Sequence, residues 1–219
     1  MNDPTTLHGW GRTNPTPARV HTPTGVDEVM AHITEGSPRG VIARGLGRSY
    51  GDPAQNAGGP VLDLTGLNRI LNIDAEAEPP TVTVEAGVSL DTLMRELLGH
   101  RLWVPVLPGT RQVTIGGAIG ADVHGKNHHS QGSFGNHVRS LDLVTADGTV
   151  HTIGPDTDPD LFWATVGGMG LTGVVVRATV EVQRVETAFF SVDTDRTTDL
   201  DDLMARMTDG DDNYTYSVA

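Results

Sequence analysis

The sequence contains no cysteine, which excludes disulfide bonds, thiolate metal ligands and thiol nucleophiles. It also lacks a run of about 18 apolar residues, so no segment is expected to span a bilayer. Basic residues are scarce, because 15 Lys and Arg stand against 28 Asp and Glu, for a net charge of −13. So acidic a chain is not expected to bind nucleic acid. An anionic ligand would have to be held by backbone dipoles and a few arginines.

The amino-terminal stretch gives no sign of a targeting segment. Residues 1–24 are polar and contain prolines, and they lack the apolar core of a signal peptide, so the default expectation is a cytoplasmic protein. With 219 residues, 37% of them hydrophobic, the chain is long enough for one good core or for a domain and a half.

A glycine-rich turn follows a short apolar run near the start of the chain. Gly45, Gly47 and Gly51 would let successive backbone N–H groups face an anion without interference from Cβ atoms. A tight turn between two strands would show the same pattern. A Rossmann turn does not fit, although Asp63 has a suitable spacing, because residues 48–60 are rich in Gly and Pro and lack helical periodicity. We therefore predict a wide phosphate-binding loop between strands.

A second glycine-rich element occupies residues 108–120. Thr114 is a candidate N-cap for a short helix that begins at Ile115, and Gly116 and Gly117 would lie in its first turn. The free amides of that turn would add affinity for an anion. Two such elements in one chain indicate a large nucleotide cofactor.

Hydrophobic periodicity predicts an α+β fold. We expect helices over residues 24–33 and 90–98, a short helix from Asp160, strands over residues 41–43, 60–64, 81–85 and 171–182, and a hairpin over residues 142–152. Ser89 should cap the second helix, and Gly99 should close it at the C′ position. Asp147 and Gly148 should form a type I′ turn in the hairpin. The long final strand should change sides at residues 174–176.

The last part of the chain is also predicted to contain strands and a helix. Strands are expected over residues 189–193 and 214–218, with an amphipathic helix over residues 200–207 between them. An apolar, half-built ending is unusual for a natural terminus, so we expect a chain that is incomplete at Ala219.

Several motifs together resemble the FAD-binding domain of the vanillyl-alcohol-oxidase/PCMH flavoprotein superfamily. They are RGLGRS at 44–49, PGT at 108–110, IGGAI at 115–119, HGKNHHS at 124–130 and DLFWATVGG at 160–168. The resemblance runs from about residue 9 to about residue 179, and more weakly to residue 216. It implies a PCMH-type α+β domain of two small α/β subdomains over residues 1–185. Residues 186–219 would begin a truncated substrate-binding domain.

The resemblance also implies the cofactor FAD and the residues that contact it. Carried over by matching position, these are Ala43, Arg44, Gly45, Leu46, Gly47, Arg48, Ser49, Tyr50, Gly51, Asp52, Gly109, Thr114, Ile115, Gly116, Gly117, Ala121, Asp122, Val123, His124 and Val175. Many relatives have a histidine bonded covalently to the flavin where this chain has Arg48. Because no cysteine could form a second linkage, non-covalent FAD is implied.

The activity implied by the resemblance is oxidation of a carbinol. The substrate would be a lipid-linked sugar whose 2′-hydroxyl becomes a ketone, in the synthesis of cell-wall arabinan precursors, with a partner reductase as one candidate for what accepts the electrons. Such an enzyme would be membrane-associated or periplasmic. Two alternatives share the cofactor module: an alditol or aldonolactone oxidase, and a non-catalytic FAD-binding fragment that needs a second polypeptide.

His124 is the candidate catalytic residue, because the resemblance places it near the flavin ring. A histidine there would polarise the flavin or orient the substrate. A hydrogen-bonded loop histidine explains the residue equally well. No metal site is predicted, since the neighbouring histidines lack a ligand spacing typical of zinc: His128, His129 and His137. Trp163 and Met169 are expected in the core.

Overall fold

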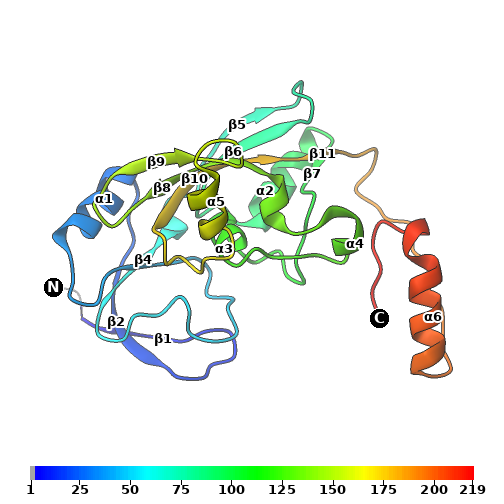
Figure 1. The fold of residues 1–219 in the computed structure, drawn as a ribbon, viewed down its shortest axis with the longest axis horizontal. Helices are drawn as coiled ribbons and strands as arrows, with labels where there is room; N and C mark the ends of the chain where they lie inside the picture. Colours follow the sequence, from blue (N-terminus) through cyan, green and yellow to red (C-terminus); the bar gives the residue numbers. More distant parts are fainter. Residues whose placement is uncertain (1–2) are drawn as a thin grey trace.

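The first part of the chain folds around a four-stranded sheet (Figure 1). The computed structural model describes residues 3–219. The strands follow the order β1 (Thr5–Leu7), β2 (Thr16–His21), β4 (Pro60–Asp63) and β3 (Ile42–Arg44). β1 is antiparallel to β2, whereas β2, β4 and β3 are parallel, and helix α1 (Val26–Glu35) lies between β2 and β3 in the chain. The helix predicted at residues 24–33 is therefore confirmed, displaced by two residues.

The second sheet is antiparallel and has β10 at its centre. Its order is β5 (Ile70–Asp74), β6 (Thr81–Glu85), β10 (Val174–Glu181), β8 (Val138–Val144) and β9 (Val150–Ile153), while β7 (Leu102–Trp103) pairs separately with β11 (Gln183–Arg184). The register between β10 and β8 shifts between Val175 and Arg177, and Val174, Val175 and Val176 are all buried. The predicted change of sides at residues 174–176 is confirmed, as is the α+β fold class.

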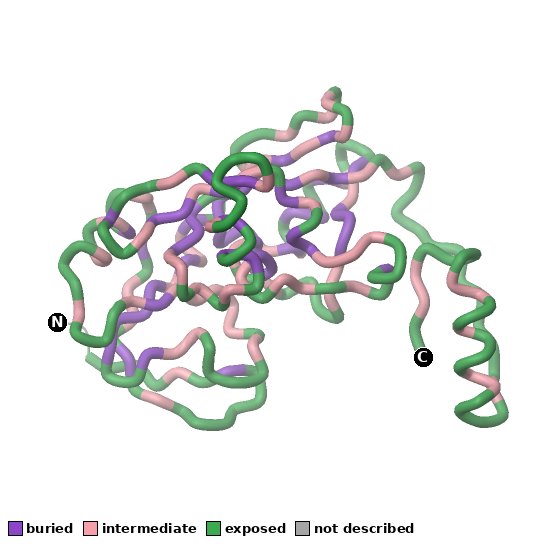
Figure 2. The backbone as a smooth tube through the Cα atoms, viewed as in Figure 1, coloured by how far each residue is buried: buried purple, intermediate pink, exposed green. Residues whose placement is uncertain are grey.

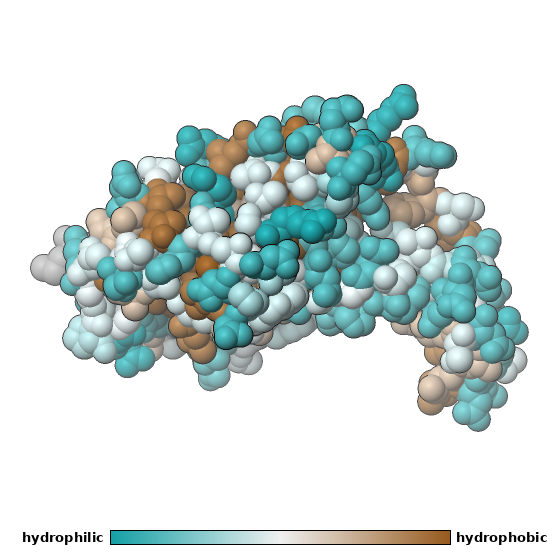
Figure 3. Space-filling model, turned by 45° about the horizontal axis from the view of Figure 1, so that its top comes forward, coloured by the Kyte–Doolittle hydropathy of each residue, from teal (hydrophilic) through white to brown (hydrophobic). Residues whose placement is uncertain are grey.

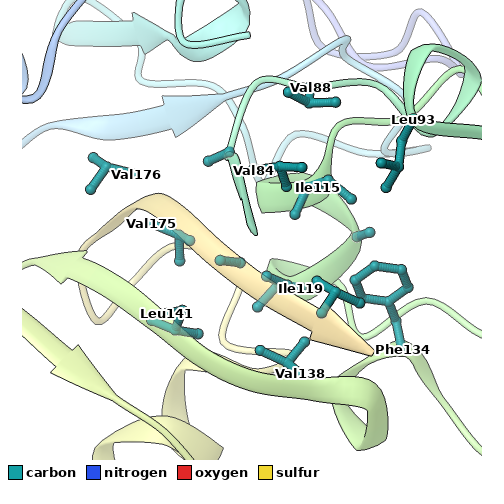
Figure 4. Close-up of a cluster of buried hydrophobic side chains, with 14 of the residues drawn as sticks. Val84, Val88, Leu93, Ile115, Ile119, Phe134, Val138, Leu141, Val175 and Val176 are labelled. Carbon is teal, nitrogen blue, oxygen red and sulfur yellow. The ribbon is translucent and has the colours of Figure 1, made fainter. Parts of the chain in front are cut away.

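Helix α3 (Ile115–Gly120) packs in the main core against the second sheet. Figure 4 shows its Ile115 and Ile119 gathered with side chains of β6, β8 and β10, and Figure 2 shows buried residues concentrated in this region. A smaller buried cluster of Ala18, Ile42 and Val61 belongs to the four-stranded sheet. The main core also includes Leu62 of β4 and Val29 of α1, so the two sheets share it, and the loops after β3 and around α3 lie between the sheets.

Helix α2 (Leu90–Gly99) begins as predicted but ends later. The Ser89 hydroxyl accepts the backbone N–H of Thr92 at 3.0 Å. Gly99 is the last residue of the helix, and the residue with left-handed backbone is Arg101, with φ of 57°. The predicted placement of Gly99 at the C′ position is wrong. The other short helical segments are η1 (Leu64–Gly66), α4 (His128–Gln131), η2 (Phe134–His137), α5 (Pro159–Thr165) and η3 (Asp211–Asn213).

The hairpin of β8 and β9 is confirmed, but its predicted turn type is wrong. A type I′ turn needs positive φ at both central residues. Only Gly148 has it here, with φ of 79°, whereas Asp147 does not. The Gly148 N–H donates to the Thr145 carbonyl at 2.8 Å, and the Thr145 N–H donates to Thr149 at 3.0 Å. A longer loop with one left-handed glycine thus joins the strands.

The C-terminal segment forms a helix but neither predicted strand. Helix α6 (Leu200–Gly210) is capped by Asp199, which accepts the N–H of Asp202 at 2.9 Å. Residues 189–193 and 214–218 have no strand pairing, because no sheet edge reaches them; Phe189 remains 85% exposed. The helix stands apart from the two sheets, and its visible surface is mainly hydrophilic (Figures 1 and 3). Residues 3–219 contain no helix that could cross a bilayer.

Candidate cofactor-binding cleft

A cleft of about 400 Å³ lies between the loop after β3 and the region around α3 and β10. Both glycine-rich elements contribute to its wall. They also touch each other, because a Cβ atom built on Gly45 would lie 2.2 Å from the Thr114 Oγ1 atom. The two turns therefore face one shared cleft instead of opposite sides of the molecule.

Most of the predicted site residues line this cleft. They are Ala43, Arg44, Gly45, Leu46, Gly47, Arg48, Ser49, Tyr50, Gly51, Thr114, Gly116, Gly117, Ala121, Val123 and Val175. Sequence reasoning missed several small or apolar lining residues: Pro53, Ala54, Leu64, Ala86, Val113, Gly120, Thr165, Met169, Gly170 and Gly173. The glycine-rich runs at residues 108–120 and after α5 carried a signal for some of them, since close backbone approach requires glycine.

The loop after β3 presents unpaired backbone donors to the cleft. Within residues 3–219, the N–H groups of residues 46–52 have no hydrogen-bond acceptor. Gly47 has φ of 67°, a left-handed conformation that other residues rarely adopt. A run of unpaired amides on a cleft wall is suited to the oxygens of an anion. The fit to a diphosphate is therefore good in this loop.

The start of α3 differs from expectation, because its amides are already bonded. Thr114 caps the helix as predicted, and its Oγ1 accepts the Gly117 N–H at 3.2 Å. The Ile115 N–H donates to Val88 at 2.9 Å, and the Gly116 N–H donates to Ala86 at 2.8 Å. The predicted free amides at this helix start are therefore wrong. Gly116 and Gly117 contribute a wall without side chains instead.

Among residues 3–219, Arg44 and Arg48 are the only charged residues that line the cleft. The Arg44 guanidinium donates to the carbonyls of His8 at 2.8 Å and Ala54 at 3.1 Å, and Arg48 donates to the Leu46 carbonyl at 2.6 Å. Neither arginine pairs with a carboxylate of residues 3–219. Burial lowers the pKa of Arg44, yet a guanidinium remains charged in proteins. The cleft is thus locally cationic in a strongly acidic chain.

Five predicted site residues do not line the cleft. Ile115 is buried in the core, and Gly109 and Asp52 are exposed at the surface. Asp122 has a left-handed backbone, with φ of 41°, and its carboxylate binds the segment around η2. His124 is the fifth.

His124 follows the lining residue Val123, but its side chain is exposed. Its ring packs edge-on against His128, with centroids 5.6 Å apart. The His129 ring lies 3.1 Å from the Tyr214 carbonyl oxygen, and that of His137 lies 2.9 Å from the Gln131 carbonyl. No group of three residues suited to a metal ion occurs within residues 3–219.

Trp163 and Met169 are not core residues, contrary to prediction. Their exposed fractions are 48% and 45%, and Met169 lines the cleft with φ of 53°. The Met169 N–H donates to the Gly120 carbonyl at 2.8 Å, and the Gly167 N–H donates to Ile119 at 3.0 Å. These bonds hold the glycine-rich loop after α5 against the end of α3. No local sequence pattern predicted this contact.

Comparison with known proteins places this architecture among flavoproteins. Residues 17–154 match the FAD binding domain family. The chain is 59% identical over 218 residues to decaprenylphosphoryl-beta-D-ribose oxidase of Mycolicibacterium smegmatis, covering 97% of this chain and 47% of that protein.

More distant relatives are also oxidoreductases by name. Identity is 32% over 180 residues to mouse L-gulonolactone oxidase, covering 80% of this chain and 40% of the relative. It is 32% over 190 residues to cytokinin dehydrogenase 5 of Oryza sativa subsp. japonica, covering 78% of this chain and 34% of the relative. The chain spans less than half the length of each of these proteins.

Proposed function

The chain belongs to the FAD binding domain family, and from that membership we propose that it holds FAD in the cleft between its two sheets as the cofactor-binding part of a sugar oxidoreductase. One observation carries the proposal. In the described part of the chain, the only charges on the cleft wall are two arginines without a carboxylate partner, beside a loop whose amides lack acceptors. This combination complements a diphosphate, because donors and cations converge on one place.

The remainder of the wall suits the aromatic parts of such a dinucleotide. Glycines leave room for close approach, and apolar side chains such as Val113, Val123 and Val175 offer a surface for planar rings. The Thr165 hydroxyl, which is hydrogen-bonded to that of Thr172 at 2.9 Å, is one of the few polar groups there. Arg44 and the amides of residues 46–52 would hold the phosphates.

We expect the FAD to be bound without a covalent link. The sequence has no cysteine, and no histidine lines the cleft within residues 3–219. Arg48 stands where many members of the superfamily have the linking histidine. Its guanidinium could contribute charge to the phosphates, but it could not form a bond to the flavin ring.

The proposed reaction is oxidation of a CH–OH group to a ketone. Bound FAD supplies the acceptor for the hydride of the carbinol carbon. The 59% identity to decaprenylphosphoryl-beta-D-ribose oxidase favours a lipid-linked ribose, oxidised at its 2′-hydroxyl, and hence a place in cell-wall arabinan precursor synthesis. A partner reductase that reoxidises the cofactor is part of this proposal. An aldonolactone substrate is the second candidate, supported by the weaker similarity to L-gulonolactone oxidase.

His124 is proposed to orient the substrate or polarise the flavin. The proposal is supported by the position of His124 directly after the lining residue Val123 and by the exposure of its side chain. Residues 1–185 would form the FAD-binding domain and residues 186–219 the beginning of a substrate-binding domain. The exposure of α6 supports that division, because none of its residues is buried within the described part of the chain.

A titration tests the proposal directly. Purified chain is mixed with FAD, and binding is followed by flavin fluorescence and absorbance; saturable 1:1 binding is expected, and its absence would overturn the proposal. Acid precipitation should release all the flavin into the supernatant, whereas colour in the pellet would contradict non-covalent binding. The loaded protein is then given the lipid-linked ribose or L-gulonolactone without oxygen. Bleaching by only one of them identifies the substrate class, and bleaching by neither indicates a non-catalytic FAD-binding fragment.

A further inference from the structure

Residues 8–11, here called the N-terminal arm, lie against the loop that presents its amides to the cleft. The Trp10 N–H donates to the Ser49 carbonyl at 2.7 Å, and the Gly11 N–H donates to the Tyr50 carbonyl at 3.2 Å. The arm itself does not line the cleft, and it precedes the region that matches the FAD binding domain family. It therefore contacts the outer side of the candidate phosphate loop.

Two glycines make this contact possible. A Cβ atom on Gly9 would lie 2.0 Å from the Gly51 carbonyl oxygen, and one on Gly11 would lie 2.7 Å from that of Tyr50. Neither glycine has positive φ, so their backbone conformation does not require glycine. Glycine is required here because the two backbones approach each other closely. Any side chain at residue 9 must push the arm and the loop apart.

The arm also contacts both arginines of the cleft. The His8 carbonyl accepts from the Arg44 guanidinium at 2.8 Å. The Arg48 guanidinium lies over the Trp10 ring, 5.5 Å from its centroid. Neither contact involves a carboxylate, and both restrict where the guanidinium lies.

Peptide geometry connects the arm to the direction of the loop amides. A trans peptide group is planar, and its N–H points opposite to its C=O. Because the arm binds the carbonyls of Ser49 and Tyr50, the N–H groups of Tyr50 and Gly51 are directed away from the arm. Both of these residues line the cleft. The same two bonds that hold the loop therefore orient two of its unpaired donors.

We infer that the N-terminal arm is a positioning element for anion binding, which fixes the loop amides and both arginines toward the phosphates of the ligand. The inference rests on the proposed function. It assigns a role to residues that contact the cleft-lining loop but do not line the cleft themselves. Loss of the arm contact should weaken binding of ligands with phosphates and should leave a ligand without phosphates almost unaffected.

The first test uses Gly9→Ala with Gly99→Ala as the matched control. A Cβ atom on Gly99 meets nothing within 4 Å, whereas one on Gly9 collides with the loop. Dissociation constants are measured for FAD, ADP and adenosine. Gly9→Ala should weaken FAD and ADP binding and lower the ratio of ADP to adenosine affinity, and Gly99→Ala should change none of these. A Gly9→Ala protein that melts earlier but keeps that ratio would show a merely structural role and overturn the inference.

The second test remains informative even if Gly9→Ala fails to fold. Trp10→Ala should weaken ADP binding by about two- to fivefold, the size of one exposed cation–π contact, and Trp10→Phe should restore most of it. In the Arg48→Ala background Trp10→Ala should have no further effect, because the ring acts through that arginine. Equal losses in both backgrounds contradict the inference and leave the proposed function standing. If the unchanged chain binds neither FAD nor ADP, both fall together.

Discussion

The Asp122 carboxylate accepts the backbone N–H of Gly135 at 2.9 Å. Its second oxygen accepts the Ser133 hydroxyl at 2.8 Å, so one side chain binds both the start of η2 and the residue before it. These bonds hold the turn that brings Ala121 and Val123 to the cleft. Asp122 was a predicted FAD contact, and the structure gives its side chain a different partner.

Asp122→Ala should lower the free energy of unfolding by roughly 2–3 kcal/mol, because it removes an acceptor of two hydrogen bonds and leaves alanine with left-handed backbone. Urea denaturation measures the change. Asp52→Ala is the control, since the Asp52 side chain is exposed and makes no hydrogen bond within the described residues, and it should stay within about 0.5 kcal/mol of the parent. Equal effects of the two substitutions would refute the role of Asp122.

Arg44→Ala should weaken FAD binding by roughly 10- to 100-fold, the equivalent of one charge-assisted hydrogen bond to a phosphate. Arg44→Lys should recover only part of the loss, because an ammonium lacks the planar fork. Flavin fluorescence gives the dissociation constants. Arg95→Ala, on the exposed face of α2 and paired with Asp91 at 3.2 Å, serves as the control. An Arg44→Ala chain with parental affinity would argue that the phosphates lie elsewhere.

Thr114→Val should cost about 1 kcal/mol of stability through loss of the α3 cap. It should also weaken FAD binding, since Thr114 is where the two glycine-rich turns meet. Thr114→Ser keeps the hydroxyl and should restore both properties. Denaturation and ligand titration on the same samples separate the two effects. Unchanged binding in Thr114→Val would mean that the contact between the turns does not shape the cleft.

Asp147 should make stability depend on pH in acid. The Thr145 hydroxyl donates to its carboxylate at 2.6 Å and the Thr149 N–H donates at 3.0 Å, which lowers the pKa of Asp147 from 3.8 to about 2. A carboxyl with a depressed pKa in the folded state stabilises the fold above its unfolded pKa, and this contribution disappears as pH falls from about 4 to about 2. The melting temperature of Asp147→Asn should therefore vary less than that of the parent over this range. Parallel curves would contradict the assignment.

Local patterns were sufficient for the elements whose causes lie nearby in the sequence. The caps Ser89 and Thr114 and the side change at residues 174–176 follow from a few adjacent residues, and each is confirmed. The absence of helical periodicity after Gly47 also predicted a loop, and residues 45–59 contain no helix.

The errors concern partners that are distant in the chain. The amides of Ile115 and Gly116 are bonded to the carbonyls of Val88 and Ala86, about one helix earlier in the sequence, which no pattern within residues 108–120 could show. The alternation around Phe189 has the propensity of a strand, but a strand forms only where a neighbour offers an edge. Met169 reaches the cleft through bonds from its loop to α3, and these depend on tertiary structure.

Two isolated cations within a chain of net charge −13 also have a kinetic consequence. At long range the molecule repels an anion, and attraction begins only at the cleft mouth. Added electrolyte screens the distant repulsion more than the short contacts, because the Debye length is about 10 Å at 0.1 M. Rising ionic strength should therefore increase the rate at which this protein associates with a dinucleotide. For a protein with a positively charged surface, the same change would lower that rate.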